Sequence, residues 1–583
     1  MANLKFTIER NAQIVVSLLK QYGIKRVVAS PGTTNKVLVW SLQQDPFFEI
    51  YSSVDERSAA YLACGMAAES GEPVVISCTG ATASRNYLSG LTEAYYRKLP
   101  VIAITSHQGI DKIGSLRAQN IDRRVAPNDV AVINVDAITI KDARDEAYCT
   151  LELNKALSET TRRGGGPVHI NLYTQYSQDF SVENIKPAKI IKRYTVYDEL
   201  PSIPNGKIAI FVGSHKLFSD KETSAIDAFC ATFDAVVICD QTSGYYGKYR
   251  VQPGLCYCQR RYLSPNIKIN LLIHIGEVSG DYMLDRLQKN IVWRVSEDGE
   301  MRDLFGKLDK VFEMPEQTFF EHYADKNIDK HEFIDNMLIE YDSLNEQIPE
   351  LPFSNIWMAQ QMSPLMPKGS ILHLGILNSL RAWNFFDCSE RVTAYSNVGG
   401  FGIDGGISSL IGASLVHPDK TYYGVFGDLA FFYDINVLGN RHVGNNVRIM
   451  LVNNGRGTEF RNYSHDCHIF GDDADLYMAA AGHFGNKSID LIKHYAEDLG
   501  YKYLSASTKA EFLENIDDFI NSISNKSVIF EVFTDSKDES DALEIMLNYE
   551  YDPKYVAKKK VRLQLSKIKE KALDSVKKIA QRY

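Results

Sequence analysis

The chain has 583 residues, of which 45% are apolar and 23% charged, and its formal net charge at pH 7 is -9. This composition excludes a disordered or fibrous chain and is typical of a globular protein with about three or four domains. The negative charge argues against nucleic acid as the main partner, and no apolar run approaches the roughly 20 residues that span a bilayer.

The N-terminus, MANLKFTIERNAQ, lacks the charged-then-apolar layout of an export signal, and the nine cysteines follow no disulfide spacing. Cys64 and Cys78 lie in apolar stretches, which favours buried thiols in a reducing compartment. We therefore expect a cytoplasmic protein. Cys256 and Cys258 are too isolated from other ligands for a zinc site, and HDCH (465–468) is more typical of a polar loop.

Short apolar strand patterns alternate with longer helical patterns, which is typical of parallel α/β architecture. They fall into three sets of similar size. The first comprises RVVAS (26–30), PVVISCTG (73–80), PVIAITS (100–106) and GPVHINLY (166–173). The second comprises KIAIFVG (207–213), DAVVICD (234–240), NLLIHIGE (270–277) and IVWRVSED (291–298). The third comprises SILHLG (370–375), RVTAYSN (391–397), YYGVFGD (422–428), RIMLVNN (448–454) and VIFEVFTD (528–535).

These sets predict an α/β fold with three successive parallel-sheet domains, at residues 1–180, 200–335 and 352–545. The polar, Lys- and Pro-containing stretch near 180–206 has the composition of a linker. The first strand of the middle set is followed by FVGSHKLF rather than GxGxxG. We therefore expect a central Rossmann-like domain without a nucleotide fingerprint.

An acidic pair, Asp55 and Glu56, opens a helical pattern built almost wholly from small residues, VDERSAAYLACGMAAESG (54–71). The helix macrodipole favours carboxylates at an N-terminus, and this accounts for most such residues. The alanines and glycines, however, let another helix or a flat ligand approach the backbone closely. A carboxylate beside such a surface is partly desolvated, which makes Glu56 a candidate functional residue.

The segment 422–457 contains two strand ends that carry oxygen donors. One strand pattern ends at Gly427-Asp428 and the next at Asn453-Asn454. Neighbouring parallel strands end at one edge of a sheet, where open α/β folds bind ligands. Asp428 and Asn454 are ligands suited to a phosphate-bound Mg²⁺ ion, and Gly427 lets the backbone approach a phosphate. Either half alone is an ordinary turn, but at a spacing of 454 − 428 = 26 residues they predict a joint site.

This spacing resembles the diphosphate motif of thiamine-diphosphate-dependent enzymes, and within that superfamily the chain most resembles the MenD-like synthases. The resemblance runs from about residue 10 to about residue 540. The matching motifs, in order, are SPGTTN (30–35), DERSAAYLACGMA (55–67), EAYYRKLPVIAITS (93–106), GPVHIN (166–171), SNVGGFGIDG (396–405) and GDLAFFYDIN (427–436).

The resemblance implies thiamine diphosphate and Mg²⁺ as cofactors, a pyrimidine-binding first domain and a diphosphate-binding third domain. Glu56 falls on the family's catalytic glutamate, which hydrogen-bonds the aminopyrimidine ring and promotes its iminopyrimidine tautomer. Gln119 falls near the reacting centre. Because this glutamate and the diphosphate site come from different subunits in the family, the resemblance implies a homodimer or homotetramer with active sites at the subunit interface.

The remaining cofactor residues follow from the same resemblance. Asp428, Asn454 and the backbone carbonyl of Arg456 fall on the Mg²⁺ ligand positions. Ile403 falls where an apolar side chain forces the cofactor into its bent shape. The positions that wrap the diphosphate in the family are occupied by Asn378, Ser379, Leu429 and Ala430, with Gly427 beside them.

The chain departs from this family at three arginines that hold substrate carboxylates. The arginine of the family's SPGSRS motif is Thr34, that of SNRG is Val398, and that of NSLxxR is Trp383, although Arg381 lies two positions away. Loss of bidentate guanidinium partners weakens recognition of a di-acid. We therefore expect an acceptor other than isochorismate.

Polar and aromatic residues near the predicted site are candidates for the changed substrate pocket. Gln119 is the best of them because of its family position, whereas a loop histidine such as His107 or a loop arginine such as Arg461 is more often merely solvated. The candidates are Thr33, Thr34, Asn35, His107, Gln108, Gln119, Trp383, Arg456, Arg461 and His465.

Residues 554–583 combine many lysines and arginines with apolar residues at helical spacing. Such a basic amphipathic helix suits an anionic membrane surface, which would make the protein peripheral there. A helix that packs on the body or on a partner subunit has the same pattern.

The leading hypothesis is a carboligase that decarboxylates a 2-oxo acid and adds the acyl carbanion to an acceptor. A simple 2-oxo acid decarboxylase shares the first half-reaction, so the sequence does not separate the two. A true MenD-type synthase and a catalytically inactive scaffold are further alternatives. Retention of Glu56, Asp428 and Asn454 together argues against the scaffold.

Overall fold

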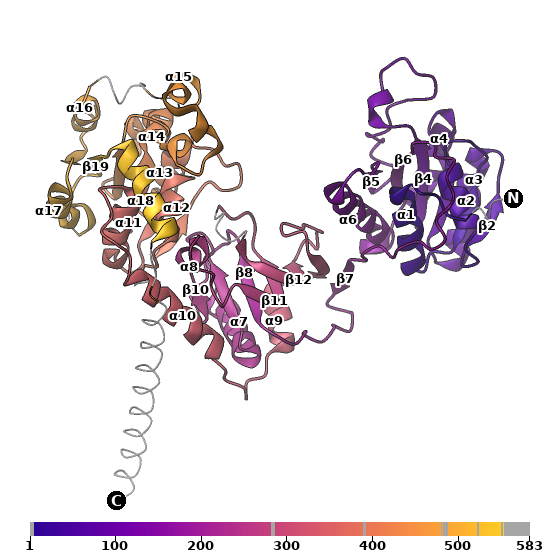
Figure 1. Ribbon diagram of the computed structural model, residues 1–583, viewed down its shortest axis with the longest axis horizontal. Coiled ribbons are helices and arrows are strands. Elements are labelled where there is room, and N and C mark those ends of the chain that lie inside the picture. Colours follow the sequence, from indigo (N-terminus) through magenta and orange to yellow (C-terminus); the bar gives the residue numbers. More distant parts are fainter. Residues whose placement is uncertain are drawn as a thin grey trace, which may run out of the picture. The chain divides into compact units, whose positions relative to one another are not determined.

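The computed structural model describes residues 5–280, 286–388, 392–479, 481, 488–521, 524–549 and 552. Its strands form three parallel sheets flanked by helices (Figure 1), so the predicted α/β class is confirmed. The chain divides into two compact units. The first comprises Met1–Asp198 and Gly299–Glu313, and the second Glu199–Asp298 and Met314–Tyr583.

The first unit contains a six-stranded sheet in the order β2-β1-β3-β4-β6-β5. Its strands are β1 (Arg26–Ala29), β2 (Glu49–Ser52), β3 (Val74–Thr79), β4 (Val101–His107), β5 (Ile133–Ala137) and β6 (Val168–Tyr173). The four interior strands match the four apolar runs in the sequence. The two edge strands were missed because they are short and mostly not buried, so they lack a continuous apolar run.

Helices cover both faces of this sheet. They are α1 (Arg10–Gln21), α2 (Lys36–Gln43), α3 (Glu56–Ser70), α4 (Thr82–Asn86), α5 (Leu88–Tyr96) and α6 (Ala143–Glu159). The small residues of α3 allow close packing against α5. A Cβ atom on Gly90 of α5 would lie 2.4 Å from the Cβ of Ala60, and the Cys64 thiol donates to the Gly90 carbonyl at 3.2 Å. Helix packing thus accounts for one face of the small-residue pattern.

The stretch near 180–206 is more than the linker that its composition suggested. It contains β7 (Lys192–Thr195), which pairs in parallel with β13 (Leu308–Glu313). Arg193 of β7 is anchored by an ion pair with Glu159 at 3.0 Å. The boundary between the two units, at Asp198 and Glu199, falls inside this stretch, as expected of a linker. The strand β7 was missed because a four-residue strand of largely polar residues leaves no apolar signal in the sequence.

The second unit begins with parallel strands in the order β10-β9-β8-β11-β12. These are β8 (Ile208–Val212), β9 (Val236–Cys239), β10 (Arg250–Val251), β11 (Lys268–Ile275) and β12 (Gln288–Ser296). The accompanying helices are α7 (Asp220–Phe233), α8 (Gly254–Cys258), α9 (Glu316–Tyr323) and α10 (Glu332–Asn345). All four apolar runs predicted for the middle set form strands.

The second unit also contains a six-stranded sheet in the order β15-β14-β16-β17-β19-β18. Its strands are β14 (Ile371–Leu374), β15 (Thr393–Tyr395), β16 (Tyr422–Gly427), β17 (Val447–Asn453), β18 (Lys502–Ala506) and β19 (Val528–Phe533). The helices are α11 (Asn355–Met362), α12 (Asn378–Asn384), α13 (Gly406–Ser414), α14 (Asp428–Asp434), α15 (Ala474–Tyr477), α16 (Leu491–Asp498), α17 (Lys509–Ile520) and α18 (Ser536–Asn548).

Short 3₁₀ turns connect several of these elements. They are η1 (Ile110–Lys112), η2 (Arg162–Gly164), η4 (Ser363–Leu365), η5 (Ile435–Gly439), η6 (Thr458–Arg461) and η7 (Asp466–Asp473).

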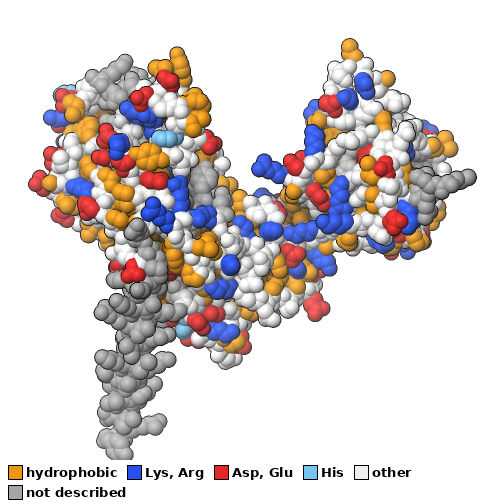
Figure 2. Space-filling view, in the orientation of Figure 1, with side chains coloured by type: hydrophobic (Ala, Val, Ile, Leu, Met, Phe, Trp, Pro, Cys, Tyr) orange, Lys and Arg blue, Asp and Glu red, His pale blue; other side chains and the backbone are white. Residues whose placement is uncertain are grey.

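On the face seen in Figure 2, basic and acidic side chains are interspersed with apolar ones. All nine cysteines are free thiols. Among the described residues, no helix has the length and apolar character needed to cross a bilayer. The predicted helix at 554–583 lies outside the described residues.

The α3–α5 contact gives a direct test of the packing. Gly90→Ala should destabilise the protein by about 1–3 kcal/mol, because the added Cβ overlaps Ala60. Glycine to alanine in an uncrowded helix would instead stabilise by up to about 1 kcal/mol. The matched control is Ala60→Gly/Gly90→Ala, which removes the closest contact and should recover part of the lost stability, since the Ala60 backbone carbon remains 3.0 Å away. Denaturant unfolding of the three proteins measures this, and a neutral Gly90→Ala variant would contradict the close packing.

Candidate active site

The ends of β16 and β17 are joined by the carboxylate of Asp428. One oxygen, Oδ1, accepts a hydrogen bond from the backbone N–H of Leu429 at 2.7 Å. The other, Oδ2, accepts from the backbone N–H of Asn454 at 3.1 Å and from that of Gly455. Because β16 and β17 pair in parallel up to Gly427, the two predicted halves of the motif meet at one sheet edge. We call this arrangement the Asp428 clasp.

The Asp428 side chain is only 5% exposed. Burial raises its pKa to about 6, although the surrounding backbone N–H groups favour the charged form. The second candidate metal ligand, Oδ1 of Asn454, accepts a hydrogen bond from the Thr458 hydroxyl at 2.8 Å, which fixes its orientation. A carboxylate and an amide oxygen at a sheet edge form a hard-oxygen set that suits Mg²⁺.

A pocket opens beside the clasp, and every cofactor residue predicted in the third domain lines it. A Cβ on Gly427 would meet no atom within 4 Å, so space lies directly against this backbone. The buried Oδ1 of Asn355 faces the pocket without a hydrogen-bond partner. Both features fit a bound phosphate and metal. The predicted residues on the wall are Asn378, Ser379, Ile403, Gly427, Asp428, Leu429, Ala430, Asn454 and Arg456.

The sequence did not single out two acidic residues that also line this pocket. Glu539 of α18 accepts hydrogen bonds from the backbone N–H of Asn355 at 3.0 and 3.1 Å, and burial raises its pKa to about 7. Glu459 forms a bidentate ion pair with Arg381, with both contacts at 2.8 Å. Both residues occur in charged segments, where nothing in the sequence distinguishes them from a solvated surface.

Three candidates from the loop after β17 have side chains engaged within the loop. Nη1 of Arg456 donates to Asp475 at 2.8 Å, and Arg461 forms an ion pair with Asp472 at 2.6 Å. His465 accepts from the backbone N–H of Cys467 at 3.1 Å. Their charges and polar atoms therefore stabilise the loop. Across the described residues, no group of three His, Cys, Asp or Glu side chains forms a metal cluster.

Two positions where the resembled family has arginine are buried in the second unit. Trp383 is fully buried, and its carbonyl accepts from Gln241 at 2.9 Å. Val398 is 4% exposed and packs against Gly280, where an added Cβ would lie 2.9 Å from its side chain. Arg381, two positions before Trp383, is held by its ion pair with Glu459. None of these positions presents an unpaired cation.

In the first unit, Glu56 is the first residue of α3 and is half-buried. Its Oε2 accepts a hydrogen bond from the side-chain amide of Asn86 at 3.2 Å. The preceding Asp55 caps the helix by accepting from the backbone N–H of Arg57 and the Ser58 hydroxyl. The two acidic residues therefore have different partners. Asp55 stabilises the N-terminus of the helix, whereas Glu56 contacts Asn86.

Three substrate candidates cluster near the carboxyl end of β4. His107 is 2% exposed, its Nδ1 donates to the Gln108 carbonyl, and its Nε2 has no partner. Burial lowers the pKa of His107. The Thr34 hydroxyl donates to the Ser106 carbonyl at 3.1 Å, and the Asn35 amide donates to the Ser30 carbonyl at 3.0 Å.

Two further candidates in this unit are exposed. Thr33 lies on the surface of the turn before α2, and Gln119 occupies the left-handed region of backbone space with φ of 67°. A glutamine in this conformation is uncommon.

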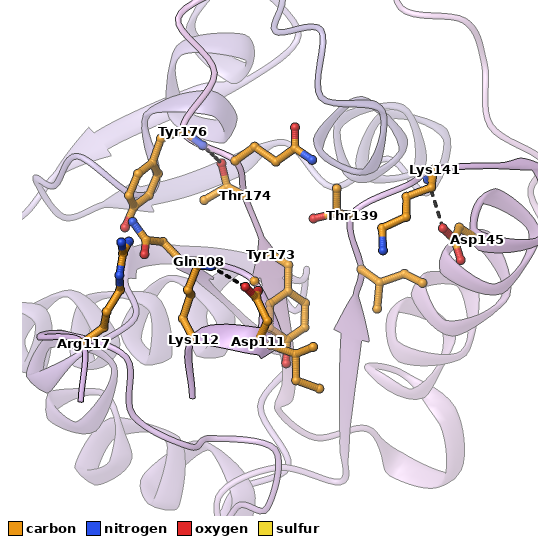
Figure 3. Close-up of a pocket in the computed structure, with 14 residues that line it drawn as sticks. Gln108, Asp111, Lys112, Arg117, Thr139, Lys141, Asp145, Tyr173, Thr174 and Tyr176 are labelled. Atoms are coloured by element: carbon orange, nitrogen blue, oxygen red, sulfur yellow. Dashed lines mark hydrogen bonds and ion pairs between the residues drawn. The ribbon is translucent and has the colours of Figure 1, made fainter. Parts of the chain in front are cut away.

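A wide groove lies beside this cluster (Figure 3), between the loop that begins at Gln108 and the segment after β6. Within it, Lys112 is paired with Asp111, and the backbone N–H of Lys141 donates to Asp145 at 3.0 Å. Of the predicted substrate residues, Gln108 is the one that lines the groove.

The chain is similar in sequence to a known protein family and to several known proteins. Residues 10–126 match the thiamine pyrophosphate enzyme N-terminal TPP-binding domain. The chain is 28% identical over 563 residues to the 2-succinyl-5-enolpyruvyl-6-hydroxy-3-cyclohexene-1-carboxylate synthase of Bacteroides fragilis, covering 91% of this chain and 97% of that protein. It is 29% identical over 572 residues to the Bacteroides thetaiotaomicron protein of that name, with the same coverage. The Desulfotalea psychrophila synthase is 27% identical over 462 residues, which is 76% of this chain and 84% of the relative.

The raised pKa of Asp428 predicts how metal binding responds to pH. Below about pH 6 the carboxyl is protonated in the metal-free protein, and Mg²⁺ must displace that proton. The increase in melting temperature caused by thiamine diphosphate with Mg²⁺ should therefore be full near pH 7.5 and should shrink as pH falls through 6. Asp428→Ala, the control, should lose most of the increase at every pH. An unchanged increase in Asp428→Ala would contradict the assignment of the metal ligand.

Proposed function

Because the chain is a MenD-like member of the thiamine-diphosphate-dependent enzymes, we propose that it decarboxylates a 2-oxo acid and transfers the acyl group to an acceptor other than isochorismate. Its cofactors are thiamine diphosphate and Mg²⁺. When bound, thiamine diphosphate supplies the carbon nucleophile and accepts the electron pair left by departing CO₂. The protein supplies binding, orientation and proton transfer.

In this proposal the Asp428 clasp holds the metal and the diphosphate. Asp428, Asn454 and the backbone carbonyl of Arg456 bind Mg²⁺. The hydrogen bonds from Leu429, Asn454 and Gly455 support this role, because they fix the carboxylate before the metal arrives. Ile403, on the pocket wall, is proposed to support the bent shape of the cofactor.

Glu56 is the proposed proton-transfer residue. A carboxyl group can hold and release a proton at the cofactor ring, and the Asn86 amide keeps it oriented. Gln119 is proposed to contact the reacting substrate. Since Glu56 and Asp428 belong to different units of the chain, and the resembled family combines them from two subunits, we propose a homodimer or homotetramer with active sites at the interface.

The main support for a different acceptor comes from the three positions where the resembled family has arginine. Thr34, Trp383 and Val398 are all buried and uncharged. A dicarboxylate bound against them would lose hydration without gaining a charged partner, which is costly in a closed site. This supports a pocket that keeps the cofactor residues while recognising a different acceptor.

A second candidate is the synthase reaction named for the relatives, with isochorismate as acceptor. The observation in its favour is that the similarity extends over 97% of the Bacteroides relatives. Arginines from other positions would then have to bind the acceptor. Product analysis separates the two candidates.

The test is to supply the holoenzyme with 2-oxoglutarate or pyruvate, with and without isochorismate, and to measure CO₂ and adduct by mass spectrometry. The wild type should release CO₂ from a 2-oxo acid and form no isochorismate adduct. Glu56→Gln should reduce CO₂ release at least about 100-fold while retaining the cofactor-induced increase in melting temperature. Efficient formation of the succinyl-cyclohexene adduct would contradict the changed acceptor. Absence of CO₂ release from every 2-oxo acid tried would contradict the decarboxylation itself.

A further inference from the structure

The first unit buries an arginine that has no acidic partner. Arg123 lies in the irregular segment before β5 and is 4% exposed. Its Nε and Nη1 atoms are fully buried without hydrogen-bond partners, and it forms no ion pair with any residue that the structure describes. Burial lowers the pKa of Arg123 to about 10, so the guanidinium remains charged at neutral pH. A buried charge without a counter-ion is unfavourable for the folded protein.

The guanidinium is held against the carboxyl ends of β3 and β4. An added Cβ on Gly80, directly after β3, would lie 3.1 Å from Cζ of Arg123, 3.0 Å from the His107 ring and 2.8 Å from the Ser106 carbonyl. The glycine therefore lets the guanidinium approach the backbone. Two further polar atoms here, Oγ of Ser106 and Nε2 of His107, also lack partners. Unsatisfied hydrogen-bonding groups thus gather at one point of the sheet edge.

Nearby acidic groups do not neutralise Arg123. The neighbouring Asp122 pairs with Arg124 instead, through contacts of 2.6 and 2.9 Å. Asp136 accepts from the Tyr173 hydroxyl at 3.3 Å. The small cavity beside Arg123 is lined by a second cation, Arg85, and by no Asp or Glu. Asp136 attracts the guanidinium at longer range, but among the described residues Arg123 has no acidic side chain in direct contact.

The same short helix, α4, links Arg123 to the proposed catalytic carboxylate. Asn86 at its end donates to Glu56 at 3.2 Å. Arg85, one residue earlier, donates to the carbonyl of Asp122 at 2.9 Å and so anchors the segment that carries Arg123. The side-chain amide of Asn134 also anchors this segment, because it donates to the Arg123 carbonyl at 3.0 Å. Hydrogen bonds through α4 therefore connect the segment that carries Arg123 with Glu56.

We propose that Arg123 binds a carboxylate of the substrate and is a specificity-determining residue of the reaction, a role that rests on the function proposed above. An incoming carboxylate would supply the missing counter-ion and accept charge-assisted hydrogen bonds from the guanidinium. Arg123 replaces none of the family's three arginines by position. Like Thr34, it lies near the carboxyl edge of the sheet in the first unit, whereas Trp383 and Val398 belong to the second unit.

The carboxylate that Arg123 binds is one that survives the reaction. A guanidinium that held the carboxylate being lost as CO₂ would stabilise the substrate more than the transition state and would slow decarboxylation. Two sources remain, namely a distal carboxylate on the 2-oxo acid donor and a carboxylate on the acceptor. Glutarate mimics the first and benzoate the second, and neither can be decarboxylated by this route.

The test is calorimetric titration of the full-length holoenzyme with glutarate, benzoate and their neutral amides, glutaramide and benzamide. At least one acid should bind wild type at least about tenfold more tightly than its amide, and the preferred acid identifies donor or acceptor. Arg123→Met should abolish this preference. Arg97→Met, which removes an exposed arginine of the same unit (53% exposed), should retain it.

Thermal unfolding without added anions separates binding from folding. Removal of an uncompensated buried charge should leave the melting temperature of Arg123→Met equal to or above that of wild type, and the binding acid should raise only the wild-type value. The proposal is wrong if acid and amide bind wild type equally, or if Arg123→Met binds the acid as tightly as wild type. Because these titrations need no turnover, they are independent of the decarboxylation assay, whose failure would instead contradict the proposed function.

Discussion

The candidate site depends on one constraint, the closure of the ends of β16 and β17 by the Asp428 clasp. A buried carboxylate is unfavourable in isolation, and here three backbone N–H groups satisfy it. The same bonds fix the turn at Asn454 and Gly455, so that the amide oxygen of Asn454 and the carboxylate are held at one edge. The geometry that suits a metal is thus built from bonds that the protein makes without it.

The clasp is independent of the three positions on which the proposed change of acceptor rests. The clasp uses backbone N–H groups and local side chains, none of which belongs to the arginine positions at Thr34, Trp383 and Val398. At those positions the structure has buried, uncharged side chains. Arg123 is the reverse case, since its buried guanidinium forms no ion pair with any residue that the structure describes. A ligand carboxylate would resolve that imbalance, which links the unusual burial to substrate recognition.

Much of the fold could be predicted from the sequence, because interior strands of parallel sheets are continuous apolar runs. The strands that were missed, such as β2, β7 and β18 (Lys502–Ala506), are short and largely not fully buried. Motif spacing predicted Gly427, Asp428 and Asn454, and the resemblance to the family supplied the other predicted pocket residues. Glu539 and Arg123 were not predicted, because a charged residue in a polar segment carries no sign of its burial until distant elements pack around it.

We propose that the Asp428 clasp is the metal and diphosphate site. The most direct measurement is a crystal structure of the protein with thiamine diphosphate and Mn²⁺ in place of Mg²⁺, in which anomalous scattering locates the metal. We expect one metal at about 2.0–2.2 Å from oxygen atoms of Asp428, Asn454 and the Arg456 backbone, with the diphosphate against Gly427. A metal bound elsewhere, or a cofactor held without contact to Asp428, would contradict it.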